Sequence, residues 1–269
     1  MKNLWKYAGL LLGAVVFGYP FLWMIAGSFK PEMEIARLGL WSDHFTAQGY
    51  TLVISKIPIA RAFVNSILVS LCVTGSVVLF GSMVGYALAR LRFGGRRVLY
   101  LVILFTMMIP FQIVLIPQYI LMVKLGWTDT YLALVAPTMM SAFSIVLFRQ
   151  FFMAIPQALI DAARIDGCSE LRILFTVVWP LSRPVIVTVA VLTFMTSWNE
   201  VLWPLMVVRE RSLMTMPQIV TLFTIGGEAE SQLGALLAAA TLLSLPVIIA
   251  YAFFQRYFIE SMASSGLKG

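Results

Sequence analysis

The residues best placed to do chemistry in this 269-residue chain lie in one polar segment, residues 149–183. The candidate residues in this segment are Asp161, Ala162, Ala163, Asp166, Gly167 and Pro180. Small alanine side chains permit close approach to another protein, and a short helix lying in a groove is a common way for proteins to dock. The chemistry predicted here is therefore docking. The residues leave open the alternative that this amphipathic helix packs against its own bundle.

The local sequence predicts a helix, a glycine turn and a second helix. Pro156 suits the first position of a helix. Gly167 suits the position just past its end, where a positive φ is common. Ser169 can cap the second helix, with Glu170 against its positive end, and Pro180 then interrupts it.

A second group of candidates is Trp198, Asn199 and Glu200, within an otherwise uncharged run. A carboxylate inside a membrane is costly and marks a functional site by default. The neighbouring indole and amide could contact a hydroxylated ligand on a substrate pathway by stacking and hydrogen bonding. The alternative is an interfacial belt with an acid that reaches toward water.

Enzymatic chemistry finds no support in the sequence. No two carboxylates share an apolar run, and the single histidine, His44, excludes a histidine-rich metal site. None of the six lysines lies in a Gly-x-x-x-x-Gly-Lys-Ser/Thr loop, so the chain has no phosphate-binding loop of its own. Cys72 and Cys168 cannot form a disulfide framework. We expect no catalytic residue, no bound metal and no cofactor on this chain.

The elements that position these residues are long apolar runs. Hydrophobic residues make up 61% of the chain and charged residues 12%, whereas a soluble domain has about a quarter charged. About 20 residues cross the hydrocarbon core as a helix. The charge-free runs are 7–29, 62–89, 98–123, 130–148, 184–208 (interrupted only by Glu200) and 231–255. They predict an all-α polytopic membrane protein with six transmembrane helices, the first an uncleaved helix because it exceeds a signal-peptide core.

Basic residues predict the orientation. With the N-terminus inside, 12 of the 19 lysines and arginines fall on the inner side, and the cluster from Arg90 to Arg97 is the strongest single indication. Both termini and residues 149–183 are then cytoplasmic. The net charge of +7 is thereby explained by topology, so no nucleic-acid partner is expected.

Small residues and prolines shape the predicted helices. Gly81 and Gly85 form a close-packing face, more consistent with packing inside the chain than with a subunit interface. Four prolines lie within the predicted spans, where they are expected to kink helices. They are Pro110, Pro117, Pro137 and Pro246.

The polar segment resembles the EAA loop of ABC importer permeases. That family pattern is Glu-Ala-Ala, three residues, Gly, nine residues and Ile-x-Leu-Pro; Ala162, Ala163, Gly167 and Pro180 match its spacing. The chain departs from it with Asp161 for Glu, Val177 for Ile and Trp179 for Leu. Further motifs resemble the carbohydrate-uptake subgroup, similar to the maltose and glycerol-phosphate permeases. They are Ile109-Pro110, Ile116-Pro117, Leu125-Gly126, Asp129-Thr130, Ile165-Asp166-Gly167, Trp198-Asn199-Glu200, Gln255-Arg256-Tyr257-Phe258 and Leu267-Lys268-Gly269.

The resemblance implies a type I importer in the cell membrane. Two permeases, usually different chains, would form the pathway for a sugar that an extracytoplasmic solute-binding protein delivers. Two cytoplasmic ATPase subunits would bind ATP and Mg²⁺ and drive alternating access. Asp161 would contact the ATPase, Ala162 and Ala163 would allow the fit, and Gly167 would set the turn.

The implied domain organisation has four parts. They are residues 1–29 (cytoplasmic end and peripheral first helix), 30–60 (outer loop), 61–256 (core type-1 transmembrane domain) and 257–269 (cytoplasmic tail). The rival reading is an ion- or proton-coupled secondary transporter that uses Glu200. Such a protein should carry several intramembrane charges, and only Glu200 qualifies. A membrane scaffold would leave the Asp161-to-Pro180 spacing unexplained.

Overall fold

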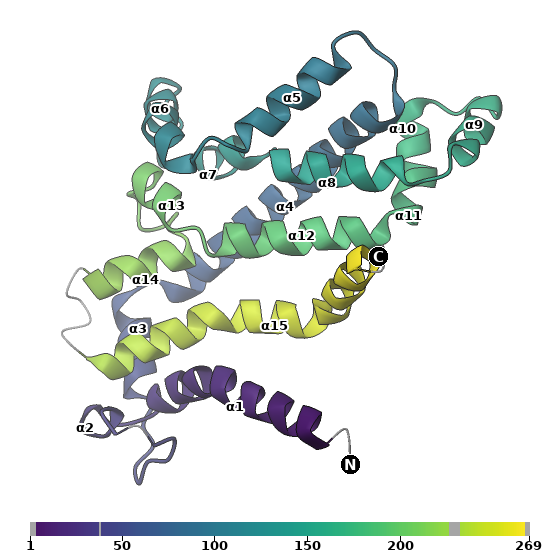
Figure 1. Ribbon diagram of the computed structural model, residues 1–269. Coiled ribbons are helices and arrows are strands. Elements are labelled where there is room, and N and C mark those ends of the chain that lie inside the picture. Colours follow the sequence, from purple (N-terminus) through teal and green to yellow (C-terminus); the bar gives the residue numbers. More distant parts are fainter. Residues whose placement is uncertain (1–3, 38, 226–231, 267–269) are drawn as a thin grey trace. The chain divides into compact units, whose positions relative to one another are not determined.

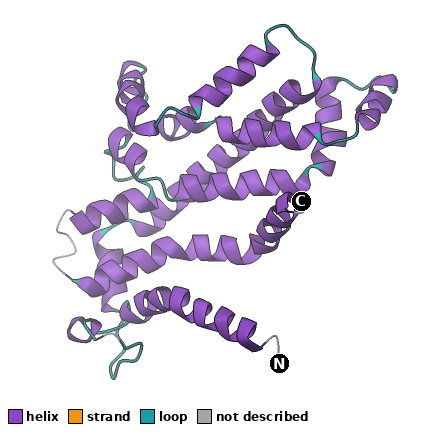
Figure 2. Ribbon diagram, in the orientation of Figure 1, coloured by secondary structure: helices purple, strands orange, loops and turns teal. Residues whose placement is uncertain are grey.

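The computed structural model describes residues 4–37, 39–225 and 232–266. All regular elements within these ranges are helices, which confirms the all-α prediction (Figure 2). The helices are α1 (Leu4–Gly27), α2 (Glu32–Ile35), α3 (Gln48–Lys56), α4 (Ile59–Arg90), α5 (Arg96–Thr106), α6 (Phe111–Lys124), α7 (Tyr131–Val135), η1 (Ala136–Thr138), α8 (Ala142–Met153), α9 (Gln157–Ile165), α10 (Glu170–Ile173), η2 (Leu174–Val178), α11 (Trp179–Leu181), α12 (Arg183–Trp198), α13 (Leu202–Val207), α14 (Met216–Ile225) and α15 (Leu233–Gly266). The chain divides into two compact units, residues 1–63 with 215–249, and residues 64–214 with 250–269.

The first unit joins the N-terminal helices to the start of α15. The most apolar window of α1 has no buried residues within the chain, as expected of a helix whose sides face lipid. The Glu32 carboxylate accepts hydrogen bonds from the backbone N–H groups of Leu233 and Gly234, so it satisfies free donors at the start of α15. The predicted outer loop is therefore partly helical and tied to a later element.

The second unit is organised around α4 and α8. A Cβ atom added at Gly85 would lie 2.7 Å from the Cβ of Phe148, and one at Gly81 would lie 2.7 Å from the Oγ of Ser144. Both contacts are with α8 of the same chain (Figure 1). The two glycines therefore let α4 and α8 approach each other closely, and that this packing is their role stays a prediction.

The span prediction needs correction at three places. Among the described residues, two single helices are long and apolar enough to cross a membrane, Lys6–Gly27 and Ile59–Arg90, and up to five spans result if each bent pair counts as one. The run 98–123 is not one kinked helix as predicted. Instead, α5 and α6 are separate helices that meet at 100° beside Pro110, which lacks an N–H group and disfavours helical geometry before it. The run 130–148 is also bent, by 43°, between η1 and α8.

The third correction concerns the run 184–208. It is not one helix, because α12 ends at Trp198 and α13 begins at Leu202. Side chains satisfy the backbone at this break. The Asn199 amide donates to the Met195 carbonyl at 2.7 Å, and Glu200 accepts the Trp203 N–H at 3.1 Å. The count of six spans and the cytoplasmic placement of both ends stay predictions.

Candidate functional site

The candidate docking helix is α9, a nine-residue helix in the polar segment. Pro156 is the N-cap of α9, so the helix begins at Gln157, one residue later than predicted, and the φ of −56° is the value that the proline ring imposes. Gly167 has a φ of +76°, which confirms the predicted glycine turn. The N–H of Gly167 bonds to the Arg164 carbonyl and that of Cys168 to the Ala163 carbonyl, each at 3.0 Å. This is the Schellman arrangement, which satisfies the last carbonyls of a helix.

The two faces of α9 differ in burial. Ile160 is fully buried and Ala163 is 8% exposed, so these residues pack against the chain itself. Asp161 and Ala162 are exposed, and Ile165 is 86% exposed. The alanine pair is therefore divided: Ala162 is available to a partner, whereas Ala163 fixes the helix to its own bundle. Consecutive helical residues lie about 100° apart, which explains why the two alanines differ in exposure. Their role in the fit to an ATPase stays a prediction.

Arg90, the last residue of α4, fixes the start of α9. Its guanidinium donates to the Phe152 carbonyl, at 3.0 Å from Nε, and to the Ile155 carbonyl. It also donates to Gln157 Oε1 at 2.6 Å. A cation at the C-terminal end of α8 satisfies carbonyls that have no intrahelical partner. The position of α9 is thus coupled to the end of α4.

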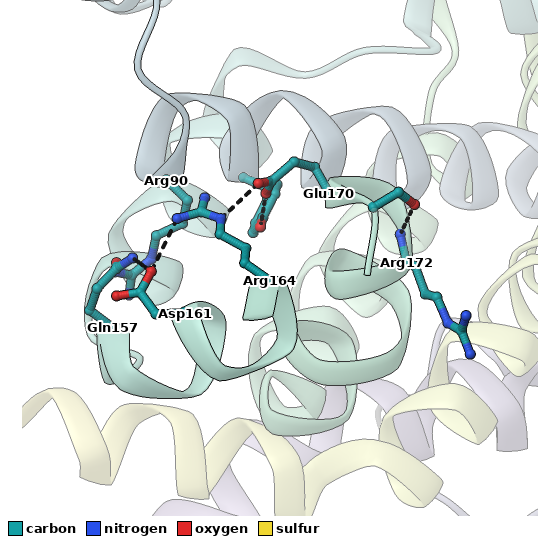
Figure 3. Close-up of polar contacts among 8 residues, drawn as sticks. Arg90, Gln157, Asp161, Arg164, Glu170 and Arg172 are labelled. Atoms are coloured by element: carbon teal, nitrogen blue, oxygen red, sulfur yellow. Dashed lines mark hydrogen bonds and ion pairs between the residues drawn. The ribbon is translucent and has the colours of Figure 1, made fainter. Parts of the chain in front are cut away.

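A chain of polar contacts continues along α9 (Figure 3). Asp161 Oδ1 accepts from Gln157 at 2.9 Å and from Arg164 at 3.2 Å. Arg164 Nε donates to Glu170 Oε1 at 2.8 Å, and Tyr86 of α4 donates to Glu170 Oε2 at 2.6 Å. The hydrogen bond to Glu170 raises the pKa of Arg164. Asp161, whose side chain is 53% exposed, is thus held by its own helix while still open to a partner.

The part of the segment after α9 makes a further contact with α4, in addition to those of Arg90 and Tyr86. Ser169 Oγ accepts the Arg172 N–H at 3.4 Å, which confirms the predicted cap of the second helix. Pro180 lies in α11, after the π-helical turn η2. The indole N–H of Trp179 donates to Ser82 Oγ of α4 at 3.1 Å. Trp179, a departure from the family pattern, therefore makes a contact that a leucine could not. Asp166, the C-cap of α9, is exposed.

The second group of candidates does not form an open site. Trp198 is fully buried and stacks on Phe194, with ring centroids 6.0 Å apart. Asn199 and Glu200 bond to backbone groups at the break between α12 and α13. Of the three, Asn199 is exposed and Glu200 half-buried. These contacts give Glu200 a helix-capping role, and they leave Trp198 unavailable for stacking on a ligand in this conformation.

Two polar residues whose structural roles were not predicted from the sequence fix the chain after α13. The Asn65 amide, 2% exposed, donates to the carbonyls of Ser212 at 3.0 Å and Met214 at 2.9 Å. Asp129 Oδ1 accepts the backbone N–H groups of Arg209 at 2.6 Å and Glu210 at 2.9 Å. These bonds to Glu210 and Arg209 lower the pKa of the Asp129 carboxyl. An amide within an apolar helix was a visible signal for Asn65. Nothing in the sequence indicates the partners of Asp129.

The apolar helices that make up the described residues define a class, that of helical membrane proteins. Residues 78–264 match the family described as "binding-protein-dependent transport system inner membrane component", and the chain belongs to this family. The resemblance seen in the sequence is thereby confirmed.

Relatives of known function cover nearly the whole chain. The arabinooligosaccharides transport system permease protein of Halalkalibacterium halodurans is 36% identical over 97% of this chain and 95% of its own length. The lactose transport system permease protein of Rhizobium radiobacter is 30% identical over 98% and 96%. In structure, the chain is similar to a bacterial ABC transporter involved in the import of the acidic polysaccharide alginate. That match has a TM-score of 0.81 and 25% identity, and covers 96% of this chain and 97% of the other.

Proposed function

We propose that this permease is one half of the translocation pathway of an ATP-driven sugar importer. The relatives that support the sugar assignment are named for arabino-oligosaccharides, lactose, and trehalose and maltose, the last from Thermococcus litoralis. A second permease, two ATPase subunits carrying ATP and Mg²⁺, and an extracytoplasmic solute-binding protein complete the assembly. The chain is multi-pass in the cell membrane, with both ends and α9 on the cytoplasmic side and residues 61–256 as its core domain.

The observation that carries the proposal is the construction of α9. The helix presents Ile165 and Ala162 outward, while its buried face and polar contacts hold it to the bundle. An exposed apolar side chain on a short, fixed helix suits a groove on a partner. In the proposed complex that partner is the ATPase, with Asp161 at the edge of the contact.

The connections from this segment to α4 supply a route for coupling. Arg90 bonds the end of α8, Tyr86 bonds Glu170, and Trp179 bonds Ser82. In the proposed mechanism, closure of the ATPase dimer displaces α9, and these contacts transmit the displacement to α4. Movement of α4 then contributes to alternating access.

The test is transport in proteoliposomes containing the full assembly and its solute-binding protein. Oligosaccharides and disaccharides are offered on the binding-protein side, with ATP and Mg²⁺ on the ATPase side. We expect accumulation that requires ATP and persists when a protonophore collapses the proton gradient. Glu200→Gln should retain ATP-driven uptake, because an amide oxygen can still accept the Trp203 N–H. Uptake driven by a proton gradient without ATP, and abolished by Glu200→Gln, would overturn the proposal in favour of ion coupling.

A further inference from the structure

A basic cavity lies in the second unit, built from residues that do not belong to the α9 site. Its volume is about 490 Å³, and its lining includes Arg96, Arg97 and Tyr100 from α5, Arg149 from α8, and Phe93 from the preceding turn. No carboxylate lines it. Three guanidinium groups around one cavity form a site for an anion, since arginine presents several donors in a planar fork that matches phosphate oxygens.

Within the described residues, no carboxylate forms an ion pair with the arginines of this cavity. Both ion pairs found among the described residues are made by Arg164. Arg96 donates to the carbonyls of Leu91 and Ala89, at 3.1 and 3.3 Å, so it also holds the turn before α5. The structure thus places uncompensated positive charge at the wall of the cavity.

Arg149 is held at the cavity by an aromatic contact. Its guanidinium carbon lies 4.0 Å from the centroid of the Tyr100 ring, a cation–π contact that fixes the group in place. Its Nε is buried and has no hydrogen-bond partner. This atom is closed off from solvent, so an anion in the cavity would instead meet the terminal N–H groups of Arg149, which lines the cavity.

The surroundings of the cavity favour a lipid over a free anion. Beyond its first residues α5 is apolar and outward-facing: Val98 is 65% exposed, Leu101 54% and Phe105 63%. An acyl chain could lie along this side, whereas inorganic phosphate would leave it uncovered. Basic pockets at the ends of membrane helices suit acidic lipid headgroups. We infer that the cavity binds the phosphate headgroup of an anionic phospholipid, with its acyl chains against α5.

The test is lipid retention by the purified transporter assembly, measured by native mass spectrometry with phosphatidylglycerol as the probe. The double variant Arg97→Gln/Arg149→Gln should weaken binding on the order of 20-fold, about fivefold for each arginine. The matched control is Arg172→Gln, which removes an exposed arginine that points away from the α9 cluster and does not line the cavity (Figure 3). This control should bind like wild type. Equal loss in the control and the double variant would overturn the inference.

Further variants and ligands distinguish loss of folding from loss of binding, and a lipid phosphate from free phosphate. Arg97→Gln alone removes an exposed charge without touching the Tyr100 contact, so it keeps the test decisive where the double variant does not fold. Arg149→Lys should retain most binding. Phosphatidylcholine should bind weakly, and inorganic phosphate should fail to displace phosphatidylglycerol. Equal retention of phosphatidylcholine, or displacement by phosphate alone, would overturn the anionic-lipid assignment.

Discussion

Asp129 is a single residue that stabilises a remote turn by its charge. It has a φ of 55°, which asparagine and aspartate tolerate better than most residues, and its own N–H donates to the Val207 carbonyl at 2.9 Å. The carboxylate in turn accepts the N–H groups of Arg209 and Glu210. One residue therefore fixes both ends of the connection after α13.

The lowered pKa of Asp129 makes a pH-dependent prediction. A carboxyl with a folded pKa below its unfolded value of about 3.9 contributes stability that is fully present above that value. This contribution is lost as the pH falls through the folded pKa. Asp129→Asn keeps the backbone preference but removes the charge. We expect faster amide exchange at Arg209 and Glu210 than in wild type at neutral pH, with the difference closing at acid pH. A difference that is independent of pH would contradict the electrostatic role.

At the scale of elements, α9 is defined by its ends and by its buried face. The sequence alone predicts the helix, the glycine turn and the Ser169 cap, because these depend on neighbours in the chain. It does not predict that Ala163 faces inward, nor that Arg90 and Trp179 bond to other elements. Those features depend on tertiary contacts between residues 62 to 97 positions apart.

The breaks in the predicted spans have the same explanation. Composition locates apolar runs, and the runs it gives for α1 and α4 agree closely with the observed helices. Composition cannot show that the chain turns at Pro110 or that side chains cap a break at residues 199–201. Proline inside a membrane helix is compatible with a mild kink or a full turn, and neighbouring helices determine which occurs.

Gly167→Ala tests the C-terminal end of α9. A left-handed conformation costs a residue with a Cβ atom about 1 kcal/mol, so the end of the helix should fray. In the Gly167→Ala variant we expect faster amide exchange at position 167 and at Cys168, because the N–H groups of these two positions close the turn. The matched control is Gly94→Ala, also in open space but without a positive φ. Equal exchange in both variants and wild type would show that the turn does not require glycine.

At the scale of the whole molecule, the chain belongs to a family of membrane transport components, and its relatives match it over nearly its full length. The ATPase subunits of the proposed assembly would deliver the energy of ATP hydrolysis to this chain through one of its surfaces. In the proposed assembly that surface is the exposed side of α9.

The most direct test of this account is co-purification of an ATPase with the full chain from membranes in mild detergent. Ile165→Asp places a charge at the most exposed apolar position of α9, and Met33→Asp does the same in α2, where Met33 is 92% exposed. We expect the ATPase to accompany wild type and Met33→Asp, and its recovery with Ile165→Asp to fall at least about tenfold, since a buried unpaired charge costs several kcal/mol. Undiminished recovery with Ile165→Asp, or no ATPase with wild type, would contradict the assignment of α9 as the coupling helix.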